Sequence, residues 1–245
     1  MSTTLETAFP PLPDGTGNYR GAVLPIYGCN GNPECIAHCW LKGKSGTMLR
    51  QRLGRFCEDC KTMKPHVHWD RFNKLDRMRD SCVLSGHFCE IADLDYGDIW
   101  RIQFIIKGKP KHLFQIFTHR PMEFYANYPI WPKNTWCMGT FTQGEIAFPP
   151  ELECGMRVAY VEPVLRKLHF VDPILSPRQY SQWLVIGLLN HAKYESLGIT
   201  EEQLYHWIMD LICDARDLGI AIWCKNAKDP RWARMGIMPV QEWPK

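Results

Sequence analysis

The chain has 245 residues, of which 45% are hydrophobic and 22% charged, and its formal net charge at pH 7 is +3. This composition is ordinary for a globular protein, and the length indicates one large domain with a substantial core. The mild charge neither requires nor excludes nucleic acid as a partner. No apolar segment approaches the length of a membrane span and the N-terminus has no signal-peptide pattern, so we expect a cytoplasmic protein without membrane contact.

The beginning of the chain differs in composition from the rest. Residues 3–18 are rich in Pro, Gly and Thr, which predicts a flexible N-terminal arm over residues 1–20. Residues 21–245 are then expected to form a single domain, with a candidate Cys/His insert around residues 55–72. The 11 cysteines indicate metal or cluster binding rather than disulfides, because disulfides are rare in a reducing compartment and an odd number cannot all pair.

Seven short apolar runs predict β-strands. They are continuously apolar rather than alternating, which is typical of parallel strands covered on both faces. Helices are predicted over residues 97–107, over residues 121–128, and from a capping box at Thr200 and Gln203 to a stop at Gly219. Alternating strands and helices predict an α/β fold, with a full or partial (β/α) barrel of about six to seven parallel strands. The seven runs are residues 22–27, 82–85, 113–118, 136–141, 158–161, 183–188 and 220–224.

Three cysteines, Cys29, Cys35 and Cys39, lie close together in a Gly-, Asn- and Pro-rich loop directly after the first predicted strand. Three thiolates can hold three irons of a four-iron cluster and leave the fourth iron open to a substrate or cofactor. A zinc site completed by His38 or a distant cysteine is one alternative, and three buried thiols are another. The hydrophilic loop is a poor place for buried thiols, which favours metal or cluster binding.

A second candidate metal site follows further along the chain. Cys57 and Cys60 form a CxxC pair, and His66 and His68 follow closely, in a pattern that fits a small zinc knuckle. Unmetallated thiols and a second role near the cluster are the alternatives, while a redox CxxC lacks its usual strand–helix context. Cys89 lies in a polar loop and is also expected near the site.

Polar residues follow several predicted strands at the point where each strand ends. Thr118 and Arg120 follow the third strand, Glu162 the fifth, Asn190 the sixth and Lys225 the seventh. In (β/α) barrels the carboxyl ends of the strands carry the functional site. We therefore expect these side chains to converge on the same mouth as the cysteine loop.

Taken in order, these motifs resemble a phage- and bacterium-encoded family of radical S-adenosylmethionine (SAM)-like proteins with a three-cysteine motif, distantly similar to spore photoproduct lyase. The resemblance runs from Ala22 to the C-terminus. Three residues separate Cys35 from Cys39 where the family usually has two, and the Cys57–Cys60 pair is outside the usual pattern. The family's acidic residue after the second strand has no clear counterpart, and Glu90 or Asp93 could stand in for it. The matching segments are Gly28-Cys29, Cys35, Cys39-Trp40, and residues 68–72, 117–121, 134–139, 162–165, 183–187 and 221–225.

The resemblance implies a [4Fe-4S] cluster on Cys29, Cys35 and Cys39, with SAM on the open iron. It implies that one electron cleaves SAM to methionine and a 5′-deoxyadenosyl radical, which takes hydrogen from a substrate in the barrel mouth. Arg120 and Lys225 would bind anionic groups of the cofactor or substrate. The residues expected to hydrogen-bond the ribose or the substrate are Thr118, Glu162 and Asn190.

Nucleic acid is the expected substrate, by analogy with the DNA-repair lyase. The expected compartment is the host cytoplasm if a phage encodes the chain. The alternative function is a zinc-stabilised nucleic-acid- or protein-binding module without catalysis. In that protein the same cysteines would be structural ligands.

Overall fold

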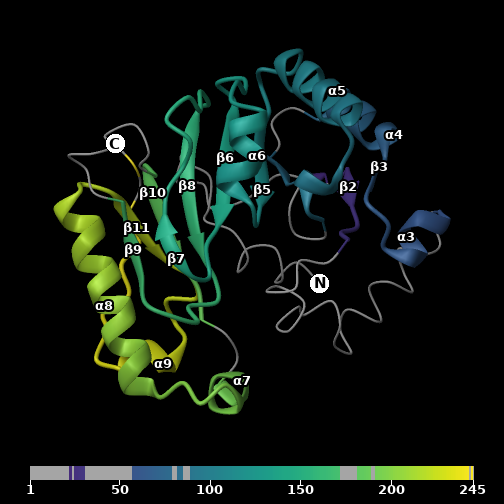
Figure 1. Ribbon diagram of the computed structural model, residues 1–245. Helices are drawn as coiled ribbons and strands as arrows, with labels where there is room; N and C mark the ends of the chain where they lie inside the picture. The colour runs from purple at the N-terminus through teal and green to yellow at the C-terminus, as the bar shows by residue number, and fades with distance from the viewer. Residues whose placement is uncertain are drawn as a thin grey trace.

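The computed structural model describes residues 22–23, 25–30, 57–78, 82–84, 89–171, 181–188, 191–242 and 244. These residues form an α/β fold around a seven-stranded sheet (Figure 1). The strands lie in the sheet in chain order, and each is parallel to its neighbours. From one edge to the other they are β1 (Ala22–Val23), β4 (Cys82–Leu84), β5 (Leu113–Thr118), β6 (Thr135–Thr140), β8 (Met156–Val161), β10 (Trp183–Ile186) and β11 (Ala221–Cys224).

The two faces of the sheet enter two different apolar cores, which explains the continuously apolar runs. On β5, Phe114 and Ile116 belong to the larger core, which also contains the buried helix residues. Phe117 faces the other way, into a smaller core that includes Trp136 and Trp183. Because both faces are covered, successive residues of a strand are apolar without alternation, as the sequence predicts.

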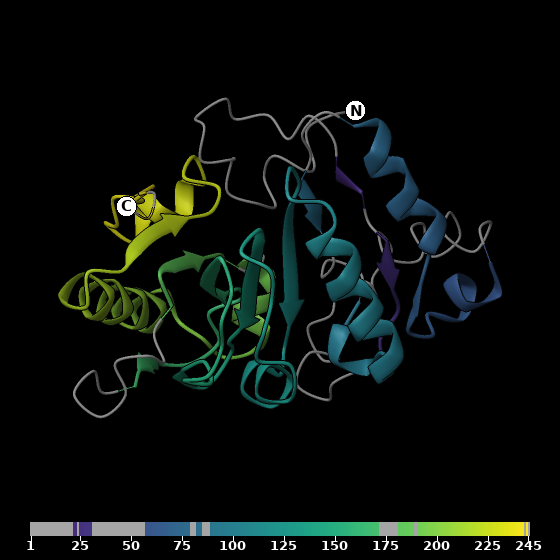
Figure 2. The same ribbon diagram turned by 90° about the horizontal axis from the view of Figure 1, so that it is seen from above.

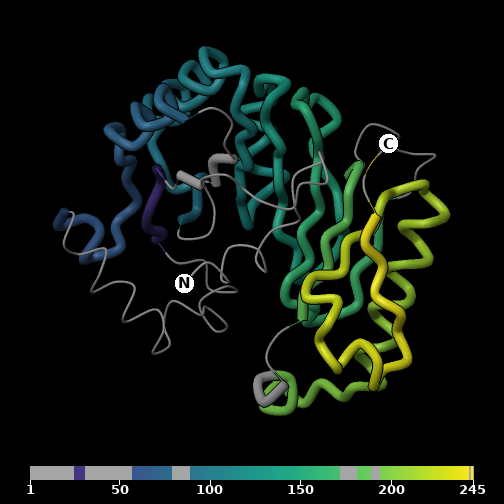
Figure 3. Tube along the Cα trace, turned by 180° about the vertical axis from the view of Figure 1, so that it is seen from behind, coloured from purple at the N-terminus to yellow at the C-terminus, as the bar shows by residue number. Residues whose placement is uncertain are grey.

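The edges of the sheet are β1 and β11, and among the described residues no pairing joins them. The predicted parallel α/β sheet of six to seven strands is confirmed, but these strands do not close into a full barrel. The segment of residues 57–78 lies beyond the β1 edge of the sheet. The helical segments of residues 201–217 and 230–234 lie at the β11 side (Figures 2 and 3).

The three predicted helices are confirmed. They are α5 (Tyr96–Lys107), α6 (Pro121–Asn127) and α8 (Glu201–Asp217). At the start of α8 the Thr200 side chain accepts a hydrogen bond from the Gln203 backbone at 3.1 Å, and the Gln203 side chain accepts one from the Thr200 backbone at 3.0 Å. Gly219 follows the helix with a φ of 68°, in the left-handed region that glycine adopts at helix ends.

The first apolar run differs from its prediction, because it forms two short strands instead of one. After β1 the chain makes β2 (Ile26–Tyr27), which pairs antiparallel with β3 (His66–Val67) in a separate small sheet. Pro25 lies between the two strands and has no N–H to donate to a ladder. Its carbonyl instead accepts a hydrogen bond from the His68 backbone at 2.7 Å.

The remaining elements are short and were not predicted. They include a second small parallel sheet of β7 (Gly144–Ile146) and β9 (Leu168–Phe170). The short helices are α3 (Glu58–Thr62), α4 (Trp69–Phe72), η2 (Asn73–Arg77), η3 (Ile91–Asp93), α7 (His191–Ser196) and α9 (Pro230–Arg234). The predicted N-terminal arm, Cys35, Cys39 and Asn190 lie outside the described residues.

Candidate functional site

The clearest chemical feature of the described residues is a compact group formed by Cys57, Cys60, His66 and His68. One ligand atom from each side chain lies within 4.8 Å of the other three. Cys60 Sγ is 3.0 Å from His68 Nε2 and 3.4 Å from His66 Nε2. Cys57 Sγ is 3.4 Å from His66 Nε2 and 3.9 Å from His68 Nε2. These four residues could hold a metal ion, as the sequence predicts for the second candidate site.

Local structure brings the four side chains together. Cys57 is the N-cap of α3, and its sulfur accepts a hydrogen bond from the Cys60 backbone at 3.3 Å. Met63 ends the helix with a φ of 60°, in the left-handed region, and turns the chain back toward β3. His66 lies in β3 and His68 directly follows this strand, and the Nε2 atoms of their rings are 3.0 Å apart.

The surroundings of the group affect its protonation. Burial raises the pKa of Cys60 to about 12, and the hydrogen bond with Cys57 adds to the rise. Burial, followed by the positive charge of Arg71, lowers the pKa of His68. A neutral imidazole is the form that binds a metal. The Nδ1 atom of His66 lies 2.7 Å from the Lys64 carbonyl, which directs Nε2 toward the group.

The Cys/His group lies directly against the start of the predicted cluster loop. The Cys29 backbone donates a hydrogen bond to the Met63 carbonyl at 3.1 Å. Gly28 has a φ of +85°, and a Cβ there would lie 2.1 Å from the Lys64 oxygen, so only glycine fits. Gly28 also forms an isolated bridge with Cys89, which places Cys89 beside the loop as predicted.

Of the three cysteines predicted to hold a cluster, the structure describes Cys29 alone, and its side chain is half-buried. Cys35 and Cys39 lie outside the described residues, so the cluster stays a prediction. The neighbouring Asn30 backbone donates to a carboxylate oxygen of Asp93 at 2.7 Å. Asp93 also forms an ion pair with Arg120, which joins the cysteine loop to the end of β5.

Thr118 and Arg120 belong to one hydrogen-bonded group around Glu90. Glu90 is only 5% exposed, and its carboxylate accepts from the Thr118 hydroxyl at 2.6 Å and from the His119 backbone at 2.7 Å. The Thr118 hydroxyl in turn accepts from the Arg120 backbone at 3.0 Å. Burial lowers the pKa of the His119 side chain, against the opposing effect of Glu90.

Glu162 and Lys225 form a second group with Tyr160. The Lys225 ammonium donates to the Glu162 carboxylate and, at 2.5 Å, to the Tyr160 hydroxyl. The Tyr160 hydroxyl donates to the same carboxylate at 2.7 Å. Tyr160 belongs to the smaller core, so this group lies at the carboxyl end of that face of the sheet.

The structure therefore brings Thr118 together with Arg120, and Glu162 together with Lys225. None of the hydrogen bonds and ion pairs found for these four described residues joins the Thr118–Arg120 group to the Glu162–Lys225 group. Sequence reasoning missed Tyr160, although its position two residues before Glu162 on a strand puts both side chains on one face.

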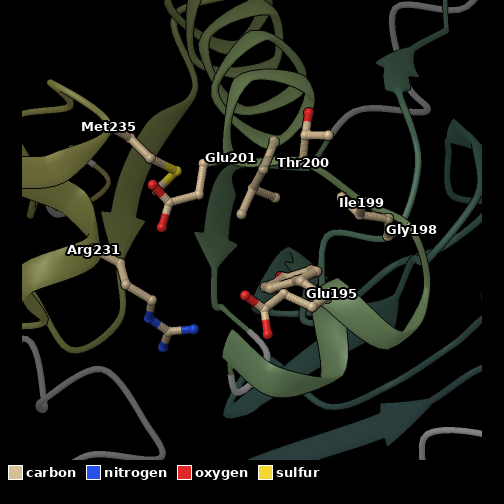
Figure 4. A pocket seen from close by; sticks show the side chains of 9 residues that line it. Glu195, Gly198, Ile199, Thr200, Glu201, Arg231 and Met235 are labelled. Atoms are coloured by element: carbon tan, nitrogen blue, oxygen red, sulfur yellow. The ribbon is translucent and has the colours of Figure 1, made fainter.

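Two pockets in the described part of the chain have no predicted site residue in their lining. One has a volume of about 340 Å³ and lies between the starts of α8 and α9, where Glu201 and Arg231 line it (Figure 4). Arg231 is already paired with Asp229. The other, of about 900 Å³, lies beside α5 and is lined by Trp100 and Phe104. The residues that line these two pockets are therefore not the ones that the sequence predicts for cofactor or metal binding.

Comparisons of the chain with protein-family models, curated proteins and solved structures found no match. Among the described helices, none combines the length and the apolar character that crossing a membrane requires.

Proposed function

We propose that the protein is an iron–sulfur enzyme of the radical-SAM type. The observation that carries the proposal is the position of Cys29 after β2. Its neighbours Gly28 and Asn30 contact Cys89 and Asp93, and Asp93 pairs with Arg120, which follows β5. The parallel strands lie in chain order, which is the order of a partial (β/α) barrel opened between its first and last strands. The carboxyl ends of such strands carry the functional residues of barrel enzymes.

In this proposal Cys29, Cys35 and Cys39 hold a [4Fe-4S] cluster whose fourth iron is open. When bound, the cluster and SAM together supply a 5′-deoxyadenosyl radical for hydrogen abstraction. Arg120 and Lys225 would provide positive charge for anionic groups of the cofactor or substrate, with Asn190 as a hydrogen-bond donor or acceptor.

Each of those two cations already has a carboxylate partner, with which an anionic ligand would have to share the donors. Asp93 orients the Arg120 guanidinium, and Glu162 orients the Lys225 ammonium. Glu162 would thus position the Lys225 side chain, and Thr118, which accepts from the Arg120 backbone, would position the start of that residue. Nucleic acid is the proposed substrate class, on the analogy with a DNA-repair lyase alone.

The test is anaerobic purification followed by iron and sulfide analysis of the wild type, Cys35→Ala and Cys213→Ala. Cys213 is exposed on α8 and serves as the matched control. We expect brown wild-type and Cys213→Ala proteins with equal iron and sulfide, and a Cys35→Ala protein that has lost both. Wild-type protein should also release 5′-deoxyadenosine from SAM after reduction. Colourless wild-type protein that cannot be reconstituted with iron and sulfide would refute the proposal.

A second candidate function is a zinc-stabilised nucleic-acid- or protein-binding module without catalysis. The observation that favours it is the compact group of Cys57, Cys60, His66 and His68. Zinc without iron in the wild-type protein, together with no 5′-deoxyadenosine, would support this function over the first.

A further inference from the structure

We propose that Cys57, Cys60, His66 and His68 bind a structural Zn²⁺ ion, which holds the backbone beneath Cys29. The proposal extends the second candidate function by linking the ion to the start of the cysteine loop, and it does not depend on a cluster or on SAM. It rests on the arrangement of the four ligand atoms and on the contacts between their backbone and residues 25–29.

The ligand atoms have the spacing of a tetrahedral zinc site. With zinc bonds of about 2.3 Å to sulfur and about 2.0–2.1 Å to nitrogen, the edges of a tetrahedron are about 3.3–3.8 Å long. The sulfur–nitrogen distances here are 3.4, 3.9, 3.4 and 3.0 Å, and the two Nε2 atoms are 3.0 Å apart. A small adjustment of the side chains would therefore centre one ion between all four atoms.

The ligand set selects zinc and a structural role. Two sulfurs and two imidazole nitrogens in a tetrahedron favour Zn²⁺, whereas calcium and magnesium require oxygen ligands. Four protein ligands fill the tetrahedron and leave no position for substrate, which is typical of a structural site. A redox role for Cys57 and Cys60 would not explain why both histidine nitrogens approach both sulfurs.

Contacts around the ligands support the same conclusion. Cys60 is fully buried, so an ion bound to its sulfur would be shielded from water on that side. The Cys57 sulfur accepts a backbone hydrogen bond from Cys60, and the Lys64 carbonyl lies at the outer nitrogen of His66. Such outer contacts orient ligands in metal sites.

The backbone that carries the ligands is also the backbone that holds the start of the cysteine loop. Tyr27 pairs with His66 in the β2–β3 ladder. The Met63 carbonyl accepts from the Cys29 backbone, and the Lys64 carbonyl lies where a Cβ of Gly28 would be. An ion that fixes residues 57–68 would therefore also fix Gly28 and Cys29.

The first experiment measures metal content by elemental analysis of the full chain, in wild type, Cys60→Ser and the exposed control Cys213→Ser. We expect about one zinc per chain in wild type and control, and a zinc affinity at least about tenfold weaker in Cys60→Ser. Replacement of zinc by Co²⁺ in the wild type should give the intense absorption of a tetrahedral thiolate site, which tests the geometry even if Cys60→Ser fails to fold. Wild-type protein that binds neither ion, or a Cys60→Ser protein that retains zinc like the control, would overturn the site.

The second experiment tests the link to Cys29 by hydrogen exchange of the wild type before and after zinc removal with a chelator. We expect faster exchange in the peptide that contains residues 26–30 and unchanged exchange in α8. Equal exchange in residues 26–30 with and without zinc would overturn the link. Because neither measurement uses iron or SAM, a failed cluster would leave both results interpretable.

Discussion

Gly187 follows β10 and lies against the Glu162 side chain. A Cβ at this position would be 2.5 Å from Glu162 Cδ and 2.7 Å from its Oε1 atom. We therefore predict that Gly187→Ala displaces the Glu162 carboxylate from the Lys225 ammonium and the Tyr160 hydroxyl. The side chain of Lys225 is only 8% exposed, so its charge would lose its partner in a poorly hydrated position.

The size of the effect follows from the two hydrogen bonds that the carboxylate accepts. Each bond to a charged group contributes about 1.5–3 kcal/mol, and the partial exposure of Glu162 reduces the sum. We expect Gly187→Ala to lower the free energy of unfolding by about 2–3 kcal/mol. The measurement is urea unfolding followed by circular dichroism, with the midpoint shifted and the slope unchanged.

The control for this prediction is the same substitution in a chain that lacks the displaced side chain. In a Glu162→Ala background, Gly187→Ala meets no carboxylate and should cost less than about 0.5 kcal/mol, because Ala also restricts the unfolded chain. An equal loss in both backgrounds would show that Gly187 acts through some other contact, and the reasoning would be wrong.

Two further predictions concern other carboxylates. Thr118→Val should lower the free energy of unfolding by about 1–3 kcal/mol, because Glu90 loses a buried donor, whereas Thr118→Ser should retain most of the stability in the same urea titration. At the start of α9, hydrogen bonds from Arg231 lower the pKa of Asp229, so the charged carboxylate stabilises the folded state at neutral pH. The stability difference between wild type and Asp229→Asn should be constant above the unfolded pKa of about 3.9 and should shrink as pH falls through the lower folded pKa. A difference that stays the same down to acid pH would contradict this assignment.

The parts of the fold that the sequence predicts are those with local signals. β5 has the predicted bounds because residues 113–118 are mostly apolar, with four large apolar side chains around Gln115 and a Thr at the end. The start of α8 follows from the Thr200 capping box, which involves residues three apart. β7 has no apolar run that would predict a strand, because Gly144 and Glu145 are exposed. This strand is defined instead by its pairing with β9.

The candidate site divides in the same way. The spacing of Cys57, Cys60, His66 and His68 predicts a metal-binding group, and the structure brings the four side chains together. The position of this group against Gly28 could not be predicted, because it depends on pairing between β2 and β3, far apart in the chain. Tyr160 could not be predicted as a site residue for another reason. Its ring packs in an apolar core, and only its hydroxyl contacts the Glu162–Lys225 ion pair.

The Cys/His group also bears on the order in which the protein folds. All four ligands come from residues 57–68, so only short loops must close to bring them together, and short loops cost little chain entropy. The sheet instead needs strand pairs such as Ala22 with Cys82 and Trp183 with Ala221, which close longer loops and form more slowly. A metal ion could therefore bind the Cys/His group and fold residues 57–68 during synthesis, before β10 and β11 have been made. The Cys/His group would then hold β3 in place, so that β2 can pair with it. This pairing would also position the start of the cysteine loop.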